Sequence, residues 1–316
     1  MMKVPDWINH RFPKPEALTG MKTMLRDKHI HTVCEEAKCP NIGDCFNAGT
    51  ATFLILGDIC TRNCSFCGVK KGVPLPPDPE EPKHIAETVS RLGLSHTVIT
   101  SVTRDDLPDK GASQFVNTVR EIRKLNIKPT IELLIPQMES DNLQSIINLA
   151  PDVINHNIET VKRLYPVVRP KYGYYESLEL LKNVKKPLCL VVSSIRASYP
   201  ESVFGINTLT KSGFMLGLGE TEAEVIELMQ DLRENNVDIL TIGQYLRPSG
   251  SRFAVNDYIS PDKFRKYEKI GYGLGFKYVA SGPYVRSSYK AEEAFLTAVR
   301  QVKRCENESI NSYSGE

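Results

Sequence analysis

Short runs of β-forming residues alternate with amphipathic segments from residue 51 onward, and this alternation constrains the fold more than any other feature of the sequence. Apolar residues within 112–125 recur at the 3.6-residue period of a helix that packs one face against a core. Thr221-Glu-Ala-Glu is a capping box, and Ser260-Pro261 marks another helix start. The predicted strands cover residues 52–56, 96–100, 129–135, 152–155, 213–218 and 238–245, and the predicted helices cover 83–92, 112–125, 141–149, 174–183, 222–235 and 261–274.

Six alternating strand and helix units predict a parallel sheet, and six units are too few for a closed eight-fold barrel. We therefore predict an α/β fold, a partial (β/α)6 TIM-like barrel with N- and C-terminal extensions. A doubly wound sheet is the alternative, because periodicity does not separate the two. The expected divisions are an N-terminal extension over 1–49, the barrel over 50–275, and a C-terminal segment over 276–316 with a disordered tail after about Arg304.

The bulk composition excludes several classes of protein. The 40 basic and 38 acidic residues give a net charge of +2, so no global field favours nucleic acid or an anionic membrane. No apolar run is long enough to cross a bilayer, and the first ten residues lack the apolar centre of a signal peptide. We therefore expect a cytoplasmic enzyme.

Cysteines cluster in one short part of the chain. Six of the eight lie between residues 34 and 67, in the patterns Cys34-x4-Cys39-x5-Cys45 and Cys60-x3-Cys64-x2-Cys67. A chain of this length without an export signal has little need of disulfides, so metal binding is the better explanation. Of the other two, Cys189 lies in an apolar run and is expected to be buried, and Cys305 lies in the polar tail and has no assigned role.

The second trio directly follows the first predicted strand, at the end of the sheet where parallel α/β folds bind ligands. Three thiolates hold three corners of a four-iron, four-sulfur cluster and leave the fourth iron open to a small molecule. Zinc is the alternative, since its ligands commonly come as cysteine pairs two to four residues apart. Zinc would need a fourth ligand from elsewhere, and two trios do not divide into sets of four.

The Cys60-to-Cys67 loop, with Phe66 before its last cysteine, resembles the signature of the radical S-adenosylmethionine (SAM) superfamily. Further stretches resemble the lipoyl synthase family within it, over most of the chain from about Pro5 to Leu296. These stretches are Cys34-Glu-Glu-Ala-Lys-Cys39-Pro-Asn-Ile-Gly-Asp-Cys45, Thr100-Ser-Val-Thr-Arg-Asp-Asp106, Asn155-His-Asn-Ile-Glu-Thr160, Lys211-Ser-Gly-Phe-Met-Leu-Gly-Leu-Gly-Glu-Thr221, Thr241-Ile-Gly-Gln-Tyr-Leu246 and Gly282-Pro-Tyr-Val-Arg-Ser-Ser-Tyr289.

The resemblance implies a sulfurtransferase that uses SAM and two four-iron clusters. The cluster on Cys60, Cys64 and Cys67 would bind SAM and yield a 5′-deoxyadenosyl radical, which is needed because no side-chain base removes hydrogen from an unactivated methylene. An auxiliary cluster on the first trio would supply sulfur to C6 and C8 of an octanoyl chain.

The fourth ligand of the auxiliary cluster would be the serine oxygen that matches Ser288. A hydroxyl holds iron less firmly than a thiolate, which suits a cluster that is consumed. An ordinary polar turn before the last helix is the alternative for this motif. If the assignment is correct, the C-terminal segment folds back onto the N-terminal extension.

The resemblance also suggests contacts to the cofactor at the ends of the predicted strands, with loop capping or surface charge as the alternatives. Residues assigned on this basis are Thr103, Arg104, Asp105, Asn155, Glu159, Arg169 and Lys211. His156 is instead expected to be a hydrogen-bonded structural histidine.

The implied partners are octanoylated lipoyl carrier domains, namely E2 subunits of 2-oxoacid dehydrogenases and the glycine cleavage H protein. Reduced ferredoxin or flavodoxin would supply electrons, and an iron-sulfur carrier would supply clusters, with no nucleic acid or membrane partner. Rivals are another sulfur-inserting or methylthio-transferring radical enzyme, and a zinc-stapled binding protein.

Two stretches depart from the family pattern. Residues 186–209 look longer than the family usually has, which favours an insertion over a further strand at 187–195. The loop over 248–255 lacks the usual His-Leu-Pro sequence. Neither stretch contains a predicted cluster ligand.

Overall fold

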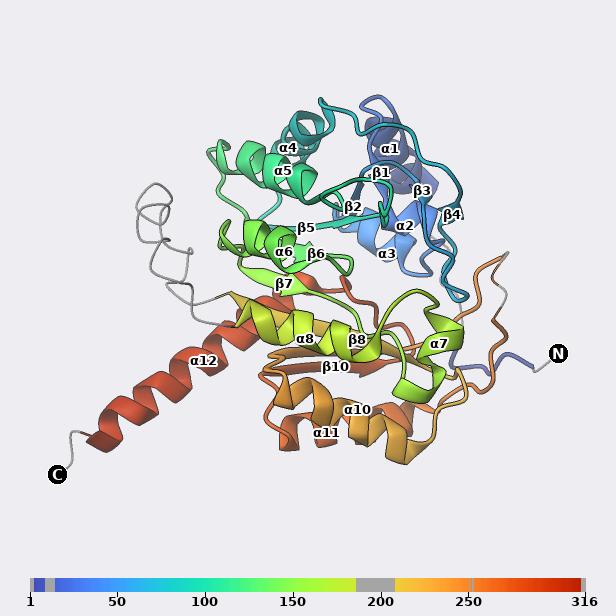
Figure 1. The fold of residues 1–316 in the computed structure, drawn as a ribbon, viewed down its shortest axis with the longest axis vertical. Coiled ribbons are helices and arrows are strands. Elements are labelled where there is room, and N and C mark those ends of the chain that lie inside the picture. Colours follow the sequence, from blue (N-terminus) through green and yellow to red (C-terminus); the bar gives the residue numbers. More distant parts are fainter. Residues whose placement is uncertain (1–2, 9–14, 186–207, 250, 252, 314–316) are drawn as a thin grey trace.

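The computed structural model describes residues 3–8, 15–185, 208–249, 251 and 253–313 (Figure 1). Its main element is an eight-stranded sheet in the order β1-β2-β5-β6-β7-β8-β9-β10. The strands are β1 His31–Thr32, β2 Thr52–Ile55, β5 His96–Ser101, β6 Thr130–Leu134, β7 Val153–Asn155, β8 Leu209–Leu216, β9 Ile239–Gln244 and β10 Tyr278–Gly282. A separate parallel pair joins β3 Ile59–Cys60 to β4 Lys70–Lys71.

Strand order decides between the two predicted architectures. From β2 to β10 every strand pairs in parallel with the next strand of the main sheet along the chain, and only β1 is antiparallel. A doubly wound sheet reverses its strand order at a switch point, and no reversal occurs in the described residues. The fold is therefore a partial barrel, as predicted.

All six predicted strand and helix units are present. The helices that follow the barrel strands are α4 Glu81–Leu92, α5 Ala112–Arg123, α6 Ser140–Ile147, α8 Tyr174–Val184, α10 Glu222–Glu234 and α11 Pro261–Gly273. Thr221 caps α10 in the predicted capping box, and Ser260 caps α11. Between β7 and α8 lie a 3-10 turn, Lys162–Leu164, and the short helix α7, Tyr165–Val168.

The sequence missed β10, which adds a seventh parallel strand to the sheet. Its residues Ala280, Ser281 and Gly282 are weak β formers, so no strand pattern marks it. The strand is held instead by its pairing with β9. Strand β10 starts at Tyr278, so it belongs to the sheet although it lies beyond residue 275, where we expected the barrel to end. Strand β8 also begins earlier than predicted, at Leu209, because Lys211 and Ser212 interrupt the apolar run.

The N-terminal extension contains α1 Pro15–Arg26, α2 Val33–Glu36 and α3 Ile42–Asn47, and β1 attaches it to the first barrel strand. At the other end of the chain, α12 Ala291–Tyr313 continues as helix beyond Arg304, where we expected a disordered tail. Extending an existing helix adds a hydrogen bond for each residue fixed, without a new nucleation cost. The predicted insertion lies almost wholly outside the described residues, as does Cys189.

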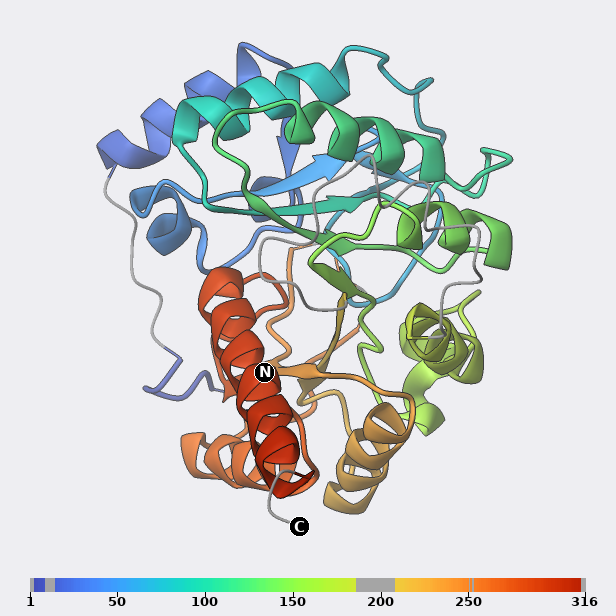
Figure 2. The same cartoon turned by 90° about the vertical axis from the view of Figure 1, so that its left-hand side faces the viewer.

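Helix α12 closes the amino-terminal end of the barrel (Figures 1 and 2). Its buried residues Phe295 and Ala298 belong to the same apolar cluster as the first residues of three strands, Val153, Leu209 and Ile239. The loop that carries Cys60, Cys64 and Cys67 follows β2 and therefore lies toward the opposite, carboxyl end. No helix within the described part of the chain is long and apolar enough to cross a membrane.

Candidate active site

The Cys60-to-Cys67 loop is anchored to neighbouring loops by backbone hydrogen bonds. Thr61 N donates to Thr103 O at 3.0 Å, just beyond the end of β5. Ser65 N donates to Val168 O at 3.1 Å, at the end of α7. The three thiols are unpaired, and burial raises the pKa of Cys67 to about 12. Such thiols bind protons unless a metal replaces them, so the donor set fits an iron-sulfur cluster.

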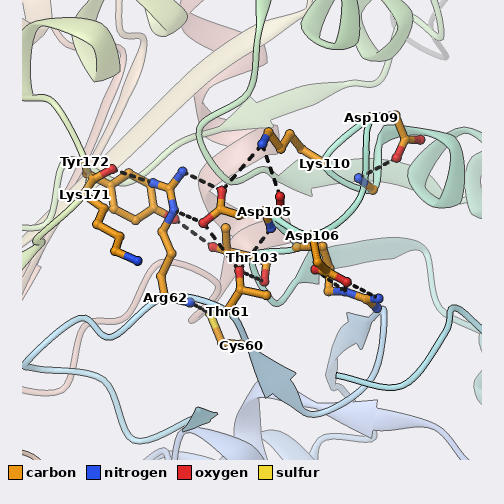
Figure 3. Close-up of polar contacts among 12 residues, drawn as sticks. Cys60, Thr61, Arg62, Thr103, Asp105, Asp106, Asp109, Lys110, Lys171 and Tyr172 are labelled. Atoms are coloured by element: carbon orange, nitrogen blue, oxygen red, sulfur yellow. Dashed lines mark hydrogen bonds and ion pairs between the residues drawn. The ribbon is translucent and has the colours of Figure 1, made fainter. Parts of the chain in front are cut away.

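A bidentate ion pair fixes this loop from one side (Figure 3). Arg62 Nε donates to Asp105 Oδ2 at 2.7 Å, and Arg62 Nη2 donates to Oδ1 at 2.8 Å. Asp105 N also donates to Thr61 Oγ1 at 3.0 Å. The hydrogen bonds from Arg62 lower the pKa of Asp105, although partial burial opposes them. Asp105 therefore keeps the cysteine loop in place, a role that the sequence did not predict.

Asp105→Asn is expected to loosen the Cys60-to-Cys67 loop. Hydrogen bonds to charged groups contribute about 1.5–3 kcal/mol, so iron held by this loop should reach a chelator about ten- to hundredfold faster. The measurement uses chains with Cys34, Cys39 and Cys45 replaced by alanine, so that only this loop holds iron. Asp106→Asn is the matched control, because the neighbouring Asp106 carboxylate binds Arg104 and not Arg62. Equal release rates for the two variants would contradict the role given to Asp105.

Tyr172 contacts two guanidinium groups. The Cζ atoms of Arg62 and Arg169 each lie over its ring, 3.9 Å from the ring centre. Thr103 Oγ1 and the Tyr172 hydroxyl are 2.8 Å apart. Both cations also interact electrostatically with Cys64, where they oppose the increase in thiol pKa that burial causes. This loop therefore lies in a positive environment, which favours thiolate ligands.

Arg169 is the better placed of the two cations for a ligand. Only 5% of the residue is exposed, and its Nη1 donates to Asn157 O at 2.7 Å and to the Tyr165 hydroxyl at 2.6 Å. Its Nε is buried without a hydrogen-bond partner among the described residues. A buried guanidinium with an unused donor is suited to an anionic group such as a carboxylate.

Glu159 follows β7 in a left-handed backbone conformation, with φ of 70°. Two backbone bonds hold it there: Glu159 N donates to Gly213 O, and Met215 N donates to Glu159 O, both at 2.9 Å. Burial raises the pKa of its carboxyl group, and Arg169 opposes that increase. The group also interacts electrostatically with Cys64. Strained residues held in this way often lie at functional sites.

The thiols of the first cysteine trio gather in the N-terminal extension. Cys34 belongs to α2, Cys45 to α3, and Cys39 to the turn between these helices. Burial, together with the proximity of the Cys39 thiol, raises the pKa of Cys34 to about 12 and that of Cys45 to about 11. The three thiols are therefore neighbours, and their chemistry fits a second iron-sulfur cluster.

Ser288 lies beside the first cysteine trio. Thr52 Oγ1 donates to Ser288 Oγ at 2.8 Å, while the backbone amide of Thr52 hydrogen bonds to Cys34. Asn41 Nδ2 donates to Tyr284 O at 2.7 Å, 243 positions further along the chain. The predicted return of the C-terminal segment onto the N-terminal extension is confirmed.

Arg286 lies near Cys39 of the first trio and near Glu159, which itself interacts with Cys64. Burial lowers its pKa, and electrostatic interactions with Cys39 and Glu159 oppose that shift. Gly243 of β9 makes this packing possible, because a Cβ there would lie 2.2 Å from Val285 O and 3.0 Å from Arg286 Nη1. The sequence assigned no separate role to Arg286, since its position depends on contacts between distant segments.

Two residues assigned to the cofactor have partners within the protein. Arg104 is buried, with its Nε and Nη2 bound to Asp106 and its Nη1 donating to Leu56 O. Lys211 Nζ lies 2.9 Å from both carboxylate oxygens of Glu132, deep in the barrel. Its charge is therefore already neutralised, and the expected contact with a cofactor carboxylate is not supported.

His156 is a structural histidine, as expected. Its ring nitrogens lie 2.9 Å from Ile135 O and 3.1 Å from Ser177 Oγ. Burial lowers its pKa to about 3. The residue is therefore neutral and bonded at both nitrogens, which leaves neither for a metal.

The comparisons with known proteins agree with the fold. The family model described as the Radical SAM superfamily matches residues 54–189. The structure of methylornithine synthase aligns with a TM-score of 0.53 and 15% sequence identity, covering 72% of this chain and 70% of that one. At that identity the alignment supports the fold alone. The protein is a radical SAM enzyme.

Curated relatives narrow the class further. The lipoyl synthase of Caldanaerobacter subterraneus subsp. tengcongensis is 51% identical over 293 residues, which cover 92% of this chain and 96% of the relative. The lipoyl synthase of Rubrobacter xylanophilus is 48% identical over 291 residues, covering 92% of this chain and 85% of that protein. The chain belongs to the lipoyl synthase family.

Proposed function

We propose that this lipoyl synthase uses two four-iron clusters, one held by Cys60, Cys64 and Cys67 and the other by the first cysteine trio with Ser288. The observation that carries the proposal is the position of Thr52, which hydrogen bonds to Ser288 through its side chain and to Cys34 through its backbone amide. A serine hydroxyl beside three unpaired thiols, one buried and two half-buried, completes a four-donor set.

When bound, SAM and the first cluster supply a radical that removes hydrogen from C6 and C8 of a protein-bound octanoyl chain, and the second cluster supplies the sulfur. The protein holds the reacting groups and excludes water. Arg62, Asp105 and Tyr172 fix the Cys60-to-Cys67 loop, and Arg104 anchors the end of β5.

We assign the SAM contacts to residues beside the Cys60-to-Cys67 loop. Arg169 offers its unused Nε to the carboxylate of the methionine part, and Glu159 accepts a ribose hydroxyl. Asn155 Oδ1 is buried and lacks a partner in the part of the chain that the structure describes, so it offers a second acceptor for the ribose. Thr103 acts through Tyr172, to which it is hydrogen bonded.

The same assignment indicates where the substrate binds. An octanoyl chain on a lipoyl carrier domain, in E2 subunits or the H protein, would enter between the two cysteine groups, near Arg286. Reduced ferredoxin or flavodoxin would supply electrons, and an iron-sulfur carrier would restore the consumed cluster. We assign residues 1–49 and the segment after β10 to the auxiliary cluster, and the strands between them to radical formation.

Iron analysis of anaerobically reconstituted protein tests the number of clusters. The wild type is expected to hold about eight iron atoms, since each cluster contains four. Replacing Cys60, Cys64 and Cys67 by alanine should leave about four and abolish SAM cleavage. Replacing Cys34, Cys39 and Cys45 should also leave about four while SAM is still cleaved. About two zinc atoms and no iron would overturn the proposal.

A product assay tests the reaction itself. Reconstituted protein is incubated with SAM, a reductant and an octanoylated carrier peptide, and the peptide is analysed by mass spectrometry. The expected product gains two sulfur atoms in a dithiolane ring. Cleavage of SAM without any sulfur in the peptide would support instead another radical enzyme with a different substrate.

A further inference from the structure

A buried ion pair in the barrel interior has no part in the reaction described above. Lys211 of β8 and Glu132 of β6 have side chains only 1% exposed, and the nitrogen of Lys211 lies 2.9 Å from each oxygen of Glu132. His96 Nε2 is 3.8 Å from the same carboxylate. Burial favours the neutral acid, yet Lys211 and His96 lower the pKa of Glu132 to about 2. Glu132 is therefore ionised.

The ion pair is linked to the C-terminal loop through Asn155, on the strand between β6 and β8. Asn155 Nδ2 donates to Glu132 Oε1 at 2.9 Å and to Ser287 Oγ at 2.8 Å. These two bonds use both hydrogens of the amide, so its orientation is fixed. The bond to Glu132 has a charged acceptor and is the stronger kind of hydrogen bond.

Ser287 continues the connection. Its hydroxyl accepts from Asn155 and donates to Asn157 Oδ1 at 2.9 Å. The next residue is Ser288, which binds Thr52 at the edge of the first cysteine group. A continuous path of hydrogen bonds thus runs from the buried charges to the residue that precedes the fourth ligand.

A purely structural origin does not explain this arrangement well. A buried ion pair is seldom more stable than apolar side chains of similar size, so stability alone gives no reason for charges here. A polar network does define a single position for the groups that it binds. The loop over residues 283–290 has no regular secondary structure, so such bonds determine where its side chains lie.

We propose that Glu132 and Asn155 are positioning residues for Ser288, which they hold at the auxiliary cluster through Ser287. This inference rests on the proposed function, because it assumes that Ser288 is a cluster ligand. The barrel interior therefore sets the geometry of a cluster whose other ligands come from the N-terminal extension. Loss of either link lets Ser288 move away from the three thiols, and the cluster loses iron more readily.

The test isolates the auxiliary cluster by replacing Cys60, Cys64 and Cys67 with alanine, so that SAM contacts do not enter the result. Iron release to a chelator and the electron paramagnetic resonance spectrum of the reduced cluster are measured for Ser288→Ala, Ser287→Ala and Asn155→Ala. Losing one or two hydrogen bonds corresponds to about tenfold faster release. We expect that increase in Ser287→Ala and Asn155→Ala, with spectra shifted toward that of Ser288→Ala.

Ser281→Ala is the matched control. Ser281 lies in β10, and its hydroxyl donates to Phe264 O at 2.8 Å, away from the path. This variant should keep the release rate and spectrum of the background. A Glu132→Leu/Lys211→Met variant removes the charges without leaving one unpaired, and it should release iron as Asn155→Ala does.

Each other outcome is informative. If Ser288→Ala speeds release but Asn155→Ala and Glu132→Leu/Lys211→Met do not, the positioning role is overturned while the cluster assignment stands. If Ser287→Ala alone matches Ser288→Ala, Ser287 acts directly and the path from the barrel is again excluded. If the background holds no iron, the proposed function itself fails and the positioning role fails with it.

Discussion

Ser288→Ala should abolish sulfur insertion while SAM is still cleaved to 5′-deoxyadenosine. Ser288 lies beside Thr52 and the first cysteine trio, whereas the loop from Cys60 to Cys67 is held by separate contacts from Arg62 and Asp105. Removing this proposed ligand of the auxiliary cluster should therefore leave radical formation intact. Both products are measured in the same reaction, by chromatography for the nucleoside and mass spectrometry for the carrier peptide.

Ser281→Ala serves as the control for this prediction as well, because it makes the same chemical change seven positions earlier, in β10. It should retain both activities. Full product formation by Ser288→Ala would remove the residue from the site. Equal loss of both activities would mean that the change disturbs the whole active site and not the auxiliary cluster alone.

The second large effect is on stability. Lys211→Met leaves the Glu132 carboxylate buried without its cation, and breaking a buried pair in this way costs about 3–5 kcal/mol. Glu132→Leu/Lys211→Met removes both charges and should recover most of that loss. Urea unfolding of the reconstituted protein, monitored by circular dichroism, gives the midpoints.

Lys290→Met is the matched control, since Lys290 pairs with Glu293 on the surface, where both side chains are more than half exposed. Its midpoint should equal that of the wild type. If Lys211→Met unfolds at the same urea concentration as Lys290→Met, the pair does not contribute as described.

The pH dependence of this contribution has a definite sign. The pKa of Glu132 is lowered in the folded protein, from an ordinary value of 4.5 to about 2. The stabilisation is therefore complete above about pH 4.5 and is lost as the pH falls through about 2. As the pH falls through that window, the free energy of unfolding of the wild type should decrease relative to that of Glu132→Leu/Lys211→Met.

Much of the architecture follows from local sequence patterns. The sequence predicts six strand and helix units because its apolar residues either recur with a period of 3.6 or form short β-rich runs. Both patterns arise when an element buries apolar side chains in a core, and the structure contains all six units. The cysteine spacing predicts the cluster ligands that we propose for the Cys60-to-Cys67 loop, since three thiols within eight residues can converge on one centre. Resemblance of the flanking motifs to the family added Ser288 and the role of the first trio, Cys34, Cys39 and Cys45.

Other parts of the site had no local signal. The sequence analysis assigned Asp105 and Lys211 to the cofactor. In the structure Asp105 pairs with Arg62, 43 positions away, and Lys211 pairs with Glu132, 79 positions away. The composition around Tyr172 does not indicate its two guanidinium neighbours. Strand β10 was missed for the same reason, because its pairing with β9 compensates for weak β formers.

The sequence by itself determined the kinds of donor atoms and the alternation that builds the barrel, because both depend on residues close together in the chain. Only the tertiary structure decided which charges neutralise one another, and that Thr52, Cys34 and Ser288 meet. Those contacts arise when β2, the N-terminal extension and the segment after β10 pack together. Their strength depends on burial and distance, which no short stretch of sequence specifies.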